Sequence, residues 1–537
     1  MKKEWRPGIP IESGCDYFAR EKEYHITLRD TVTVQNERYI ALRTDAFPVF
    51  LLLCGKKNVT LDFGGATLVF HGKIQPFLLD GGENITVKNC KVTYARPMYS
   101  EFLIREMTEE GALLAPNPCC PCRVEGDLLI PVGEGWENNR LRFHGRFFQV
   151  FDPETRLGCG LHLGGVGTPF VPDPTFPYRI DLYTAEARGE NILLKGKFPD
   201  FYRAGRILVI EHEERLLSSV FALEVKGLTL ENYRILSGGG MGILLSRVED
   251  VTLSRFLMTH TEESPALIAN PADGVHAFGA SGAFRIRDSI FEGMIDDALN
   301  VHANFRTVKQ AQGREILSHR ASCEKQAQRL YRAGDEIAVY RGQTMEEVAR
   351  YRILSVEFLD GDLAKFTVDR PVLPHEEGDM IESLTANCDL TIENCAFGKA
   401  NTHLRLQTRG TCAIRNCTTE LPFLFSGDAT YWFESGPATD FTVENCRFVG
   451  EKAKICVKSE VLSTDAAPYY HRNLKILGCT FDTESPLEAQ FADGIRFLGN
   501  RNAQGKEMTL TLKNCGEAEA DNCRVLRLAE KQSLNIN

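Results

Sequence analysis

A short pattern of alternating apolar and polar residues recurs along the chain and often ends in an Asn-Cys pair. Apolar residues at every second position are typical of strands that bury one face. Asparagine tolerates left-handed backbone angles, so the pair indicates a turn at the end of the strand. The recurrences are ITVKNCKV (85–92), LTLENYRI (228–235), VTLSRFLM (251–258), FRIRDSIF (284–291), LTIENCAF (390–397), CAIRNCTT (412–419), FTVENCRF (441–448), LKILGCTF (474–481) and LTLKNCGE (510–517).

The spacing of this motif predicts stacked coils. Leu228 and Val251, which begin successive motifs, are 23 residues apart, and the later motif cysteines follow one another after 22, 29 and 33 residues. A basic coil of 22 or 23 residues with loop insertions is typical of a right-handed parallel β-helix, whose coils bury their faces against one another. We therefore expect an internal ladder of small buried side chains, formed by Cys395, Cys417, Cys446 and Cys479.

Two stretches interrupt the repeat and are too long to be plain loops. Both are rich in strand patterns, and AGRILVIEHEER (204–215) in the first resembles AGDEIAVYRGQT (333–344) in the second. Each is predicted to be a small inserted β-barrel. Helix is scarce, and only MEEVARY (345–351) is predicted to be helical. The predicted organisation is β-helix over 1–97, a barrel region over 98–220, β-helix over 221–305, a barrel region over 306–388 and β-helix coils over 389–537.

Composition narrows the class of protein. The 62 basic and 73 acidic residues give a net charge of −11, which argues against a nucleic-acid or anionic-membrane binder. The hydrophobic share of 43% is ordinary for a globular protein. No apolar segment follows Lys2 and Lys3, and no stretch of ~18 apolar residues predicts a membrane span. A cytoplasmic location is therefore expected.

The 17 cysteines are expected to be mostly free, buried thiols in a reducing compartment. Cys119, Cys120 and Cys122 form one tight cluster, but no second ligand pair at zinc-finger spacing accompanies it. We expect neither a metal nor another cofactor.

Candidate chemistry concentrates between the two insertions, in NPADGVHAFGASGAFRIRDSIFEGMIDDALNVHANF (270–305). Asp273 and Asp296 are 23 residues apart, and each stands two residues before an apolar residue that begins a strand. Stacked coils would bring their backbones within ~4.8 Å. Asp297 follows directly, with Gly274 as its counterpart one coil earlier. Asp296 and Asp297 can share one side only if a turn or bulge follows Gly293.

Like charges this close raise the pKa of one carboxyl, which then stays protonated beside an ionised partner. An acid for the leaving oxygen and a base for water are the parts that glycoside hydrolysis requires. Two other readings stay open at this point. The aspartates could cap turns, or they could form a calcium site.

Further polar residues fall in the same angular sector of the coil. FSGDATYWFESGPATDFTVENC (425–446) supplies an aromatic and acidic cluster, and THLRLQTRG (402–410) supplies basic and amide side chains. Together they predict a polar, aromatic groove for a sugar, although a half-buried tryptophan and a solvated strand face would show the same pattern. The candidates are Asp428, Tyr431, Trp432 and Glu434 from the first segment and Arg405, Gln407 and Arg409 from the second.

The polar residues beside the aspartates are also candidate substrate contacts. Asn300 could bind a sugar hydroxyl, and His276 and His302 could orient a carboxylate or a hydroxyl, or be satisfied structural histidines. Neither histidine has a partner at the i, i+4 spacing of metal sites. His260 is expected to be a loop residue.

Three of these segments, ADGVHAF (272–278), GMIDDALNVHANF (293–305) and GDATYWFESG (427–436), resemble glycoside hydrolase family 110, the α-1,3-galactosidases. The resemblance implies a right-handed parallel β-helix with two inserted β-barrels. It also implies metal-independent, inverting removal of terminal α-1,3-linked galactose, including that of blood-group-B-type glycans. On this resemblance Asp296 is the general acid, and Asp273 and Asp297 share the base role.

The expected partner is an oligosaccharide or glycan, with no nucleic acid and no membrane, and self-association is left open. One alternative is a β-helix hydrolase or lyase of uronic-acid polymers, which would use Arg405 and Arg409 in a basic cleft. The other alternative is a non-catalytic carbohydrate-binding β-helix.

Overall fold

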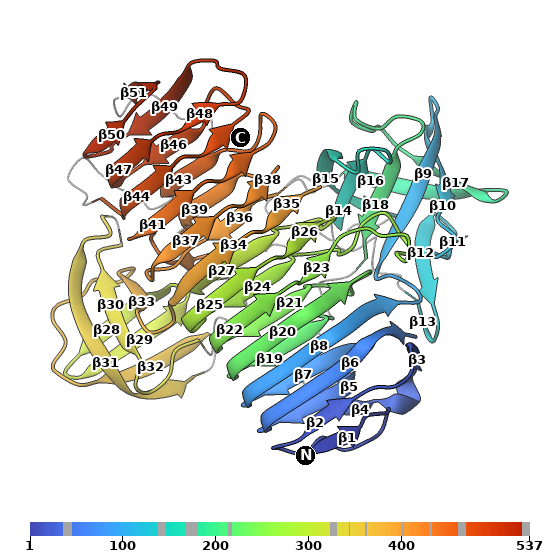
Figure 1. The fold of residues 1–537 in the computed structure, drawn as a ribbon, viewed down its shortest axis with the longest axis horizontal. Helices are drawn as coiled ribbons and strands as arrows, with labels where there is room; N and C mark the ends of the chain where they lie inside the picture. The colour runs from blue at the N-terminus through green and yellow to red at the C-terminus, as the bar shows by residue number, and fades with distance from the viewer. Residues whose placement is uncertain are drawn as a thin grey trace.

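The computed structural model winds the chain into a parallel β-helix that carries two β-barrels (Figure 1). This confirms the fold class predicted from the repeat. The described residues are 1–35, 46–137, 146–167, 181–212, 217–322, 330–342, 344–359, 362–399, 402–428, 432–459 and 469–528.

Each regular coil has three faces. Its first two strands belong to a 21-stranded sheet, sheet A, and its third strand belongs to a 14-stranded sheet, sheet B. One complete coil consists of β22 (Glu249–Ser254), β23 (Leu257–Met258) and β24 (Val275–Phe278). The next consists of β25 (Ser281–Arg287), β26 (Ile290–Glu292) and β27 (Leu299–Asn304).

The other strands of sheet A are β1 (Lys2–Glu4), β2 (Asp16–Phe18), β3 (Glu23–Ile26), β6 (Lys57–Phe70), β8 (Glu83–Tyr94), β20 (Lys226–Ile235), β34 (Cys388–Glu393), β35 (Ala396–Gly398), β37 (Cys412–Arg415), β38 (Thr418–Thr419), β41 (Phe441–Glu444), β42 (Arg447–Phe448), β44 (His471–Leu477), β45 (Thr480–Phe481), β47 (Ala492–Leu498), β48 (Arg501–Asn502) and β50 (Ala518–Ala520). Those of sheet B are β4 (Val32–Gln35), β5 (Ala46–Cys54), β7 (Gln75–Asp80), β19 (Val220–Leu223), β21 (Ile243–Ser246), β36 (Leu404–Leu406), β39 (Phe423–Gly427), β40 (Glu434–Ser435), β43 (Ile455–Ser459), β46 (Leu487–Gln490), β49 (Met508–Lys513) and β51 (Cys523–Leu528).

The motif asparagines make a bend in the sheet A part of a coil, inside β8 for Asn89 and between two strands for Asn394 and Asn445. Asn89, Asn394 and Asn445 have φ angles of 54°, 55° and 53°, in the left-handed region that asparagine tolerates. The residue after the bend points inward, so apolar or small side chains are required there. The prediction of a turn at the Asn-Cys pair is confirmed.

The cysteine ladder is also confirmed. The backbone N–H groups of Cys395, Cys417 and Cys446 each donate to the Sγ atom one coil further on, in every case at 3.4 Å. The ladder ends at Cys479, whose N–H donates to Oδ1 of Asn500 at 2.8 Å. All four thiols are buried, and every cysteine in the described ranges is free. The buried thiols therefore fill the core and satisfy backbone donors at the same bend.

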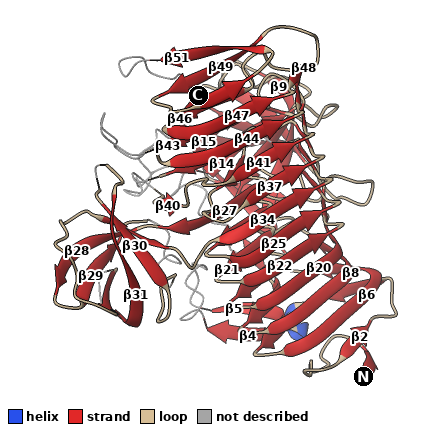
Figure 2. Ribbon diagram, turned by 60° about the vertical axis from the view of Figure 1, so that its left-hand side comes forward, coloured by secondary structure: helices blue, strands red, loops and turns tan. Residues whose placement is uncertain are grey.

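The first barrel contains β9 (Tyr99–Met107), β10 (Gly111–Pro116), β14 (Arg146–Phe151), β15 (Gly158–Val166), β16 (Asp181–Arg188), β17 (Asn191–Lys195) and β18 (Ile207–Glu211), with a small sheet of β11 (Cys122–Glu125), β12 (Leu128–Gly133) and β13 (Trp136–Glu137) beside it. The second contains β28 (Arg306–Gln312), β29 (Glu315–Arg320), β30 (Glu336–Tyr340), β31 (Glu347–Phe358), β32 (Leu363–Val368) and β33 (Met380–Ser383), and it projects from one flank of the helix (Figure 2).

The predicted helix over 345–351 is wrong. β31 begins at Glu347 and pairs with β30 and β32, and its residues Tyr351 and Ile353 alternate into the barrel core. Cross-strand pairing here overrides a local helical propensity. In the described part of the chain the one helical element is the 3-10 turn Leu28–Asp30, and no helix there is long and apolar enough to cross a membrane.

The second barrel leaves the β-helix after β27 and returns before β34, yet β27 and β36 still pair directly, with Asn300 beside Arg405. Two ion pairs attach the barrel to the coils. The Arg247 guanidinium contacts Asp335 at 2.9 Å with both side chains buried, and the Arg409 guanidinium contacts Glu382. The insertion thus leaves the stacking of sheet B uninterrupted at the point where the candidate residues lie.

Candidate active site

The candidate residues occupy the outer face of sheet B. In β24, Val275 and Ala277 belong to the core of the helix, so the alternation of the strand directs His276 to the other face. His276 pairs with Asn300, and Asn300 pairs with Arg405 on the following strand. His302 and Gln407 extend this outer face on β27 and just beyond β36. The structure thus brings these five residues together on one face of sheet B.

The register of the aspartates differs from the prediction. Val275 pairs with Leu299, and the Gly274 N–H donates to the Asp297 carbonyl oxygen at 2.8 Å. Asp297 therefore lies one coil beyond Asp273, and Asp296 is offset by one residue. The prediction failed because β27 begins at Leu299 and not at Ala298, which makes this coil one residue longer than the 23 assumed.

Asp297 is held as a carboxylate. Its Oδ2 atom accepts from Nε of Arg405 at 3.3 Å, and its Oδ1 atom accepts from the backbone N–H of His403 at 3.2 Å. Burial alone would raise the pKa of this carboxyl, but the His403 ring and N–H and the Arg405 guanidinium lower it to about 2. Asp297 is therefore ionised at neutral pH, and it is not the carboxyl with a raised pKa that the sequence predicted.

Asp296 lies in a bend and is only half-buried. Its Oδ1 atom accepts from the backbone N–H of Asp297 at 3.0 Å, and its carbonyl oxygen accepts from the hydroxyl of Thr402. Burial alone would lower the pKa of the Arg405 guanidinium, but the carboxylates of Glu434, Asp297 and Asp296 raise it. Both adjacent aspartates thus act on the same guanidinium, as the predicted turn after Gly293 allows.

Glu434 reaches this face from β40, which runs antiparallel to the end of β27. The buried carboxylate accepts from Nδ2 of Asn300 at 3.2 Å and lies 3.4 Å from Nη1 of Arg405 and 3.6 Å from Nε2 of His302. Gln407 donates to the backbone oxygen of Glu434 at 3.3 Å. Arg405 therefore bridges two carboxylates, those of Asp297 and Glu434.

The same segment is braced by Asp428. Its Oδ2 atom accepts from the backbone N–H of Trp432 at 2.6 Å, and its own N–H donates to the Glu434 carbonyl oxygen at 3.1 Å. Trp432 is half-buried, whereas Asp428 is buried. Tyr431, which the sequence placed in this cluster, lies outside the described residues.

On β24, Asp273 is buried and bonded to a histidine. Its Oδ2 atom lies 2.6 Å from Nδ1 of His276, and Nε2 of His276 lies 3.1 Å from Nε2 of His302. Both rings are 2% exposed. These histidines therefore join Asp273 to the neighbourhood of Glu434 below the surface of the molecule.

Arg409 does not join this group, because its guanidinium is bound to Glu382 and to the hydroxyl of Tyr340. Conversely, sequence reasoning missed His403. His403 stands directly before β36, the place that Gly274 and Ala298 take before β24 and β27, so no pattern in the sequence singled it out.

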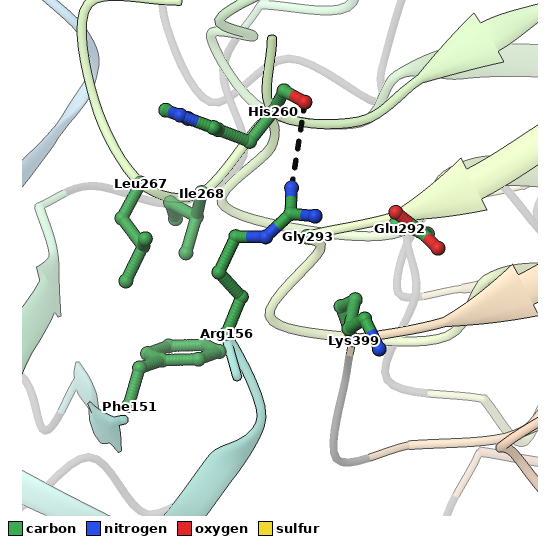
Figure 3. A pocket seen from close by; sticks show the side chains of 8 residues that line it. All are labelled: Phe151, Arg156, His260, Leu267, Ile268, Glu292, Gly293 and Lys399. Carbon is green, nitrogen blue, oxygen red and sulfur yellow. Dashed lines mark hydrogen bonds between the residues drawn. The ribbon is translucent and has the colours of Figure 1, made fainter. Parts of the chain in front are cut away.

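A small pocket lies where the first barrel meets the residues that follow β23, β26 and β35 (Figure 3). Arg156 enters it from the first barrel, with its Nη1 atom 3.4 Å from the carbonyl oxygen of His260. Gly293 and Lys399 form part of its wall and precede Asp296 and Thr402 by three residues. His260 is a loop residue, as predicted. The other lining residues are Phe151, Leu267, Ile268 and Glu292.

Among the described residues, no group of three or more His, Cys, Asp or Glu side chains is arranged to hold a metal ion. In the cysteine cluster the Sγ atoms of Cys119 and Cys120 are 3.6 Å apart, and Cys119 also contacts the carbonyl oxygen of Pro265 at 3.1 Å. The Cys119–Cys120 pair thus lies between the first barrel and the loop before Asp273.

Sequence comparison finds curated relatives over most of the chain. It is 27% identical to α-1,3-galactosidase B of Bacteroides thetaiotaomicron, an alignment that covers 87% of this chain and 77% of the relative. It is 25% identical to α-1,3-galactosidase A of Bacteroides fragilis, with 90% and 78% covered. It is 25% identical to α-1,3-galactosidase B of Phocaeicola vulgatus, with 80% and 71% covered. These names confirm the resemblance inferred from the sequence motifs.

No family model matches the chain. Among solved structures, a family 28 exopolygalacturonase of Yersinia enterocolitica aligns with a TM-score of 0.33 and 11% identity over 100% of this chain and 70% of its own. The adhesin PfbA of Streptococcus pneumoniae aligns with a TM-score of 0.29 and 7% identity over 96% and 89%.

Proposed function

We propose that this chain, a glycoside hydrolase by its kinship to the α-1,3-galactosidases, releases terminal α-1,3-linked galactose from oligosaccharides or glycans with inversion at the anomeric carbon. The relatives' names support the linkage and the sugar. Both linear chains and branched glycans of the blood-group-B kind are candidate substrates.

The observation that carries the proposal is the contrast between the adjacent aspartates. Asp297 is buried and held ionised by Arg405 and His403, whereas Asp296 is half-buried and accepts the backbone N–H of Asp297 with its Oδ1 atom. An ionised carboxylate serves as a base for water, and a carboxyl that keeps its proton serves as an acid for the leaving oxygen. Asp273, stacked one coil before Asp297, is the second base.

In this proposal the sugar contacts the half-buried side chains of the group, which are Asp296, His403, Arg405 and Trp432. The remaining candidates are each no more than 5% exposed and form a polar layer behind the first set, in which Glu434 contacts Arg405 and Asp428 accepts the N–H of Trp432. These supporting residues are His276, Asn300, His302, Gln407, Asp428 and Glu434.

The two alternatives are weaker on the same geometry. A polyuronate enzyme needs free cations for its anionic substrate, but Arg405 is paired with Asp297 and Glu434, and Arg409 is paired with Glu382. A purely binding β-helix has no need of a carboxylate whose pKa is lowered to about 2 beside a second, more accessible one. Neither alternative accounts for the pair of aspartates.

The proposal is tested with α-1,3-, α-1,4- and α-1,6-linked galactobiose and with galacturonate oligomers, each followed by chromatography. Release of galactose from the α-1,3 isomer above all is the expected result. Proton NMR at early times distinguishes the stereochemistry, since inversion releases β-galactose first. Cleavage of galacturonate oligomers alone, or of no substrate by a folded protein, would overturn the proposal.

A further inference from the structure

Three hydrogen bonds run in series through the buried histidines behind Asp273. Oδ2 of Asp273 lies 2.6 Å from Nδ1 of His276, and Nε2 of His276 lies 3.1 Å from Nε2 of His302. Nδ1 of His302 lies 2.9 Å from the carbonyl oxygen of Ala303. Each gap must contain a hydrogen, and the direction of the last, from Nδ1 of His302 to Ala303, is fixed because a carbonyl oxygen only accepts.

The number of protons follows from this series. Three gaps need three hydrogens, but two neutral imidazoles carry only two between them. A neutral His302 donates its one N–H hydrogen to the carbonyl oxygen of Ala303. A neutral His276 must then donate its hydrogen from Nε2 to His302. The gap between Nδ1 of His276 and Asp273 therefore requires a third proton. Leaving a buried gap without a hydrogen would place two acceptors face to face, which is strongly unfavourable at these distances.

We propose that Asp273, His276 and His302 bind this third proton at neutral pH, with His276 as an imidazolium against an ionised Asp273. The proton count is independent of what the protein does, whereas its placement on His276 rests on the proposed role of Asp273 as a base. His276 and His302 are then positioning residues. They keep Asp273 ionised and fix the orientation of its other carboxylate oxygen, Oδ1.

The surrounding charges agree with this assignment. Glu434 lies 3.6 Å from Nε2 of His302, so a proton that moves along the series toward His302 meets a carboxylate. The Arg405 guanidinium is shared between Glu434 and Asp297. Asp296 in this group is half-buried, and Phe278 packs on the rings of His276 and His302, with centroids 6.1 Å and 6.4 Å away. Beyond Phe278, Arg247 and Asp335 neutralise each other.

The first test is ¹⁵N NMR of the full chain labelled at its 12 histidines. His276→Asn and His302→Asn variants assign the two rings. The expected result is three protonated nitrogens among the four of these rings between pH 6 and 8. The Asp273→Asn variant is the matched control, because its side-chain amide donates to Nδ1 of His276 and only two ring nitrogens should then be protonated. Two protonated nitrogens in the unaltered protein overturn the proposal.

The second test is the pH profile of kcat/KM for His276→Asn, in which the amide still donates to Asp273 but carries no charge. Without the neighbouring cation, the acid limb of the profile should move up by at least about one pH unit. A loss of rate at all pH values with an unmoved limb contradicts the positioning role. If the unaltered protein shows three protonated ring nitrogens but the Asp273→Asn variant stays active, the proposed catalytic role of Asp273 fails and the proton count stands.

Discussion

Asp297 lies one coil beyond Asp273 in the stack, on the strand that pairs directly with that of Asp273. Each of the two carboxylates has its own basic partner, Arg405 for Asp297 and His276 for Asp273. Asp296, half-buried in the same bend, accepts the backbone N–H of Asp297. This division separates two candidate bases from one candidate acid, and the following predictions test it.

Asp296→Asn should lower activity on α-1,3-galactobiose by about 10²–10⁴-fold, because the amide cannot protonate the leaving oxygen. An activated nitrophenyl α-galactoside needs little such help, so its loss should be much smaller. Initial rates on both substrates give the comparison. Near-normal turnover of galactobiose by the folded variant would falsify the assignment of Asp296.

Asp273→Asn and Asp297→Asn should slow the two substrates by similar factors, since water must be activated whichever group leaves. The loss for each is expected to be about 10²–10⁴-fold. The same rate measurements apply, with circular dichroism as the check on folding. If either variant loses activity on galactobiose alone, the residue replaced acts as the general acid and not as a base.

Arg405→Gln should lower the free energy of unfolding at pH 7 by about 3–5 kcal/mol, because it removes the cation that two buried carboxylates share. The pKa of Asp297 is lowered in the folded state, from 3.8 to about 2, so its contribution is complete above pH 3.8 and is lost as the pH falls through about 2. The free energies of unfolding of the unaltered protein and the variant, measured by urea titration, should therefore differ most above pH 4 and converge toward pH 2.

The matched control for this variant is Arg496→Gln, which removes an exposed ion pair with Glu519. Exposed pairs contribute only about 0–1 kcal/mol, so this change should be small at every pH. An Arg405→Gln deficit that is the same at pH 7 and at pH 2.5 would show that Asp297 is not the group responsible.

Activity should survive exhaustive treatment with EDTA. The oxygens that a calcium ion would require already accept hydrogen bonds from within the protein, those of Asp297 from Arg405 and His403 and one of Asp273 from His276. Rates before and after dialysis against EDTA give the answer. Inactivation that added calcium reverses would favour the calcium reading of the three aspartates.

Arg156→Ala should selectively weaken the binding of longer substrates. The wall of the pocket around Arg156 includes Gly293, three residues before Asp296, so Arg156 is a candidate contact for the leaving part of the substrate. KM for a trisaccharide should rise several-fold, whereas kcat/KM for the nitrophenyl galactoside should stay unchanged. Glu154→Ala, on the exposed part of the same loop, is the control. Equal effects on both substrates would place the pocket outside the binding path.

The sequence was most informative where one residue satisfies one local requirement. Asparagine at a left-handed bend and a small thiol behind it are needed in each coil, so Asn394 and Cys395 could be placed from the repeat alone. It was less informative about register, because the start of β27 at Leu299 depends on pairing with β24. It could not place Glu434 over Asn300, since β40 reverses direction and crosses a gap of 134 residues in the chain.

The insertion of the second barrel between β27 and β36 has a consequence during synthesis. Arg405 follows Asp297 by 108 residues, and most of that interval is the barrel. At ~5–20 residues per second, the ribosome needs on the order of 5–20 s to deliver the guanidinium after the carboxylate. Until then the last completed coil of the β-helix exposes Asp297 without its guanidinium partner, and water hydrates this acidic edge. The barrel has this interval in which to fold, and the next coil then docks with the cation that the edge requires.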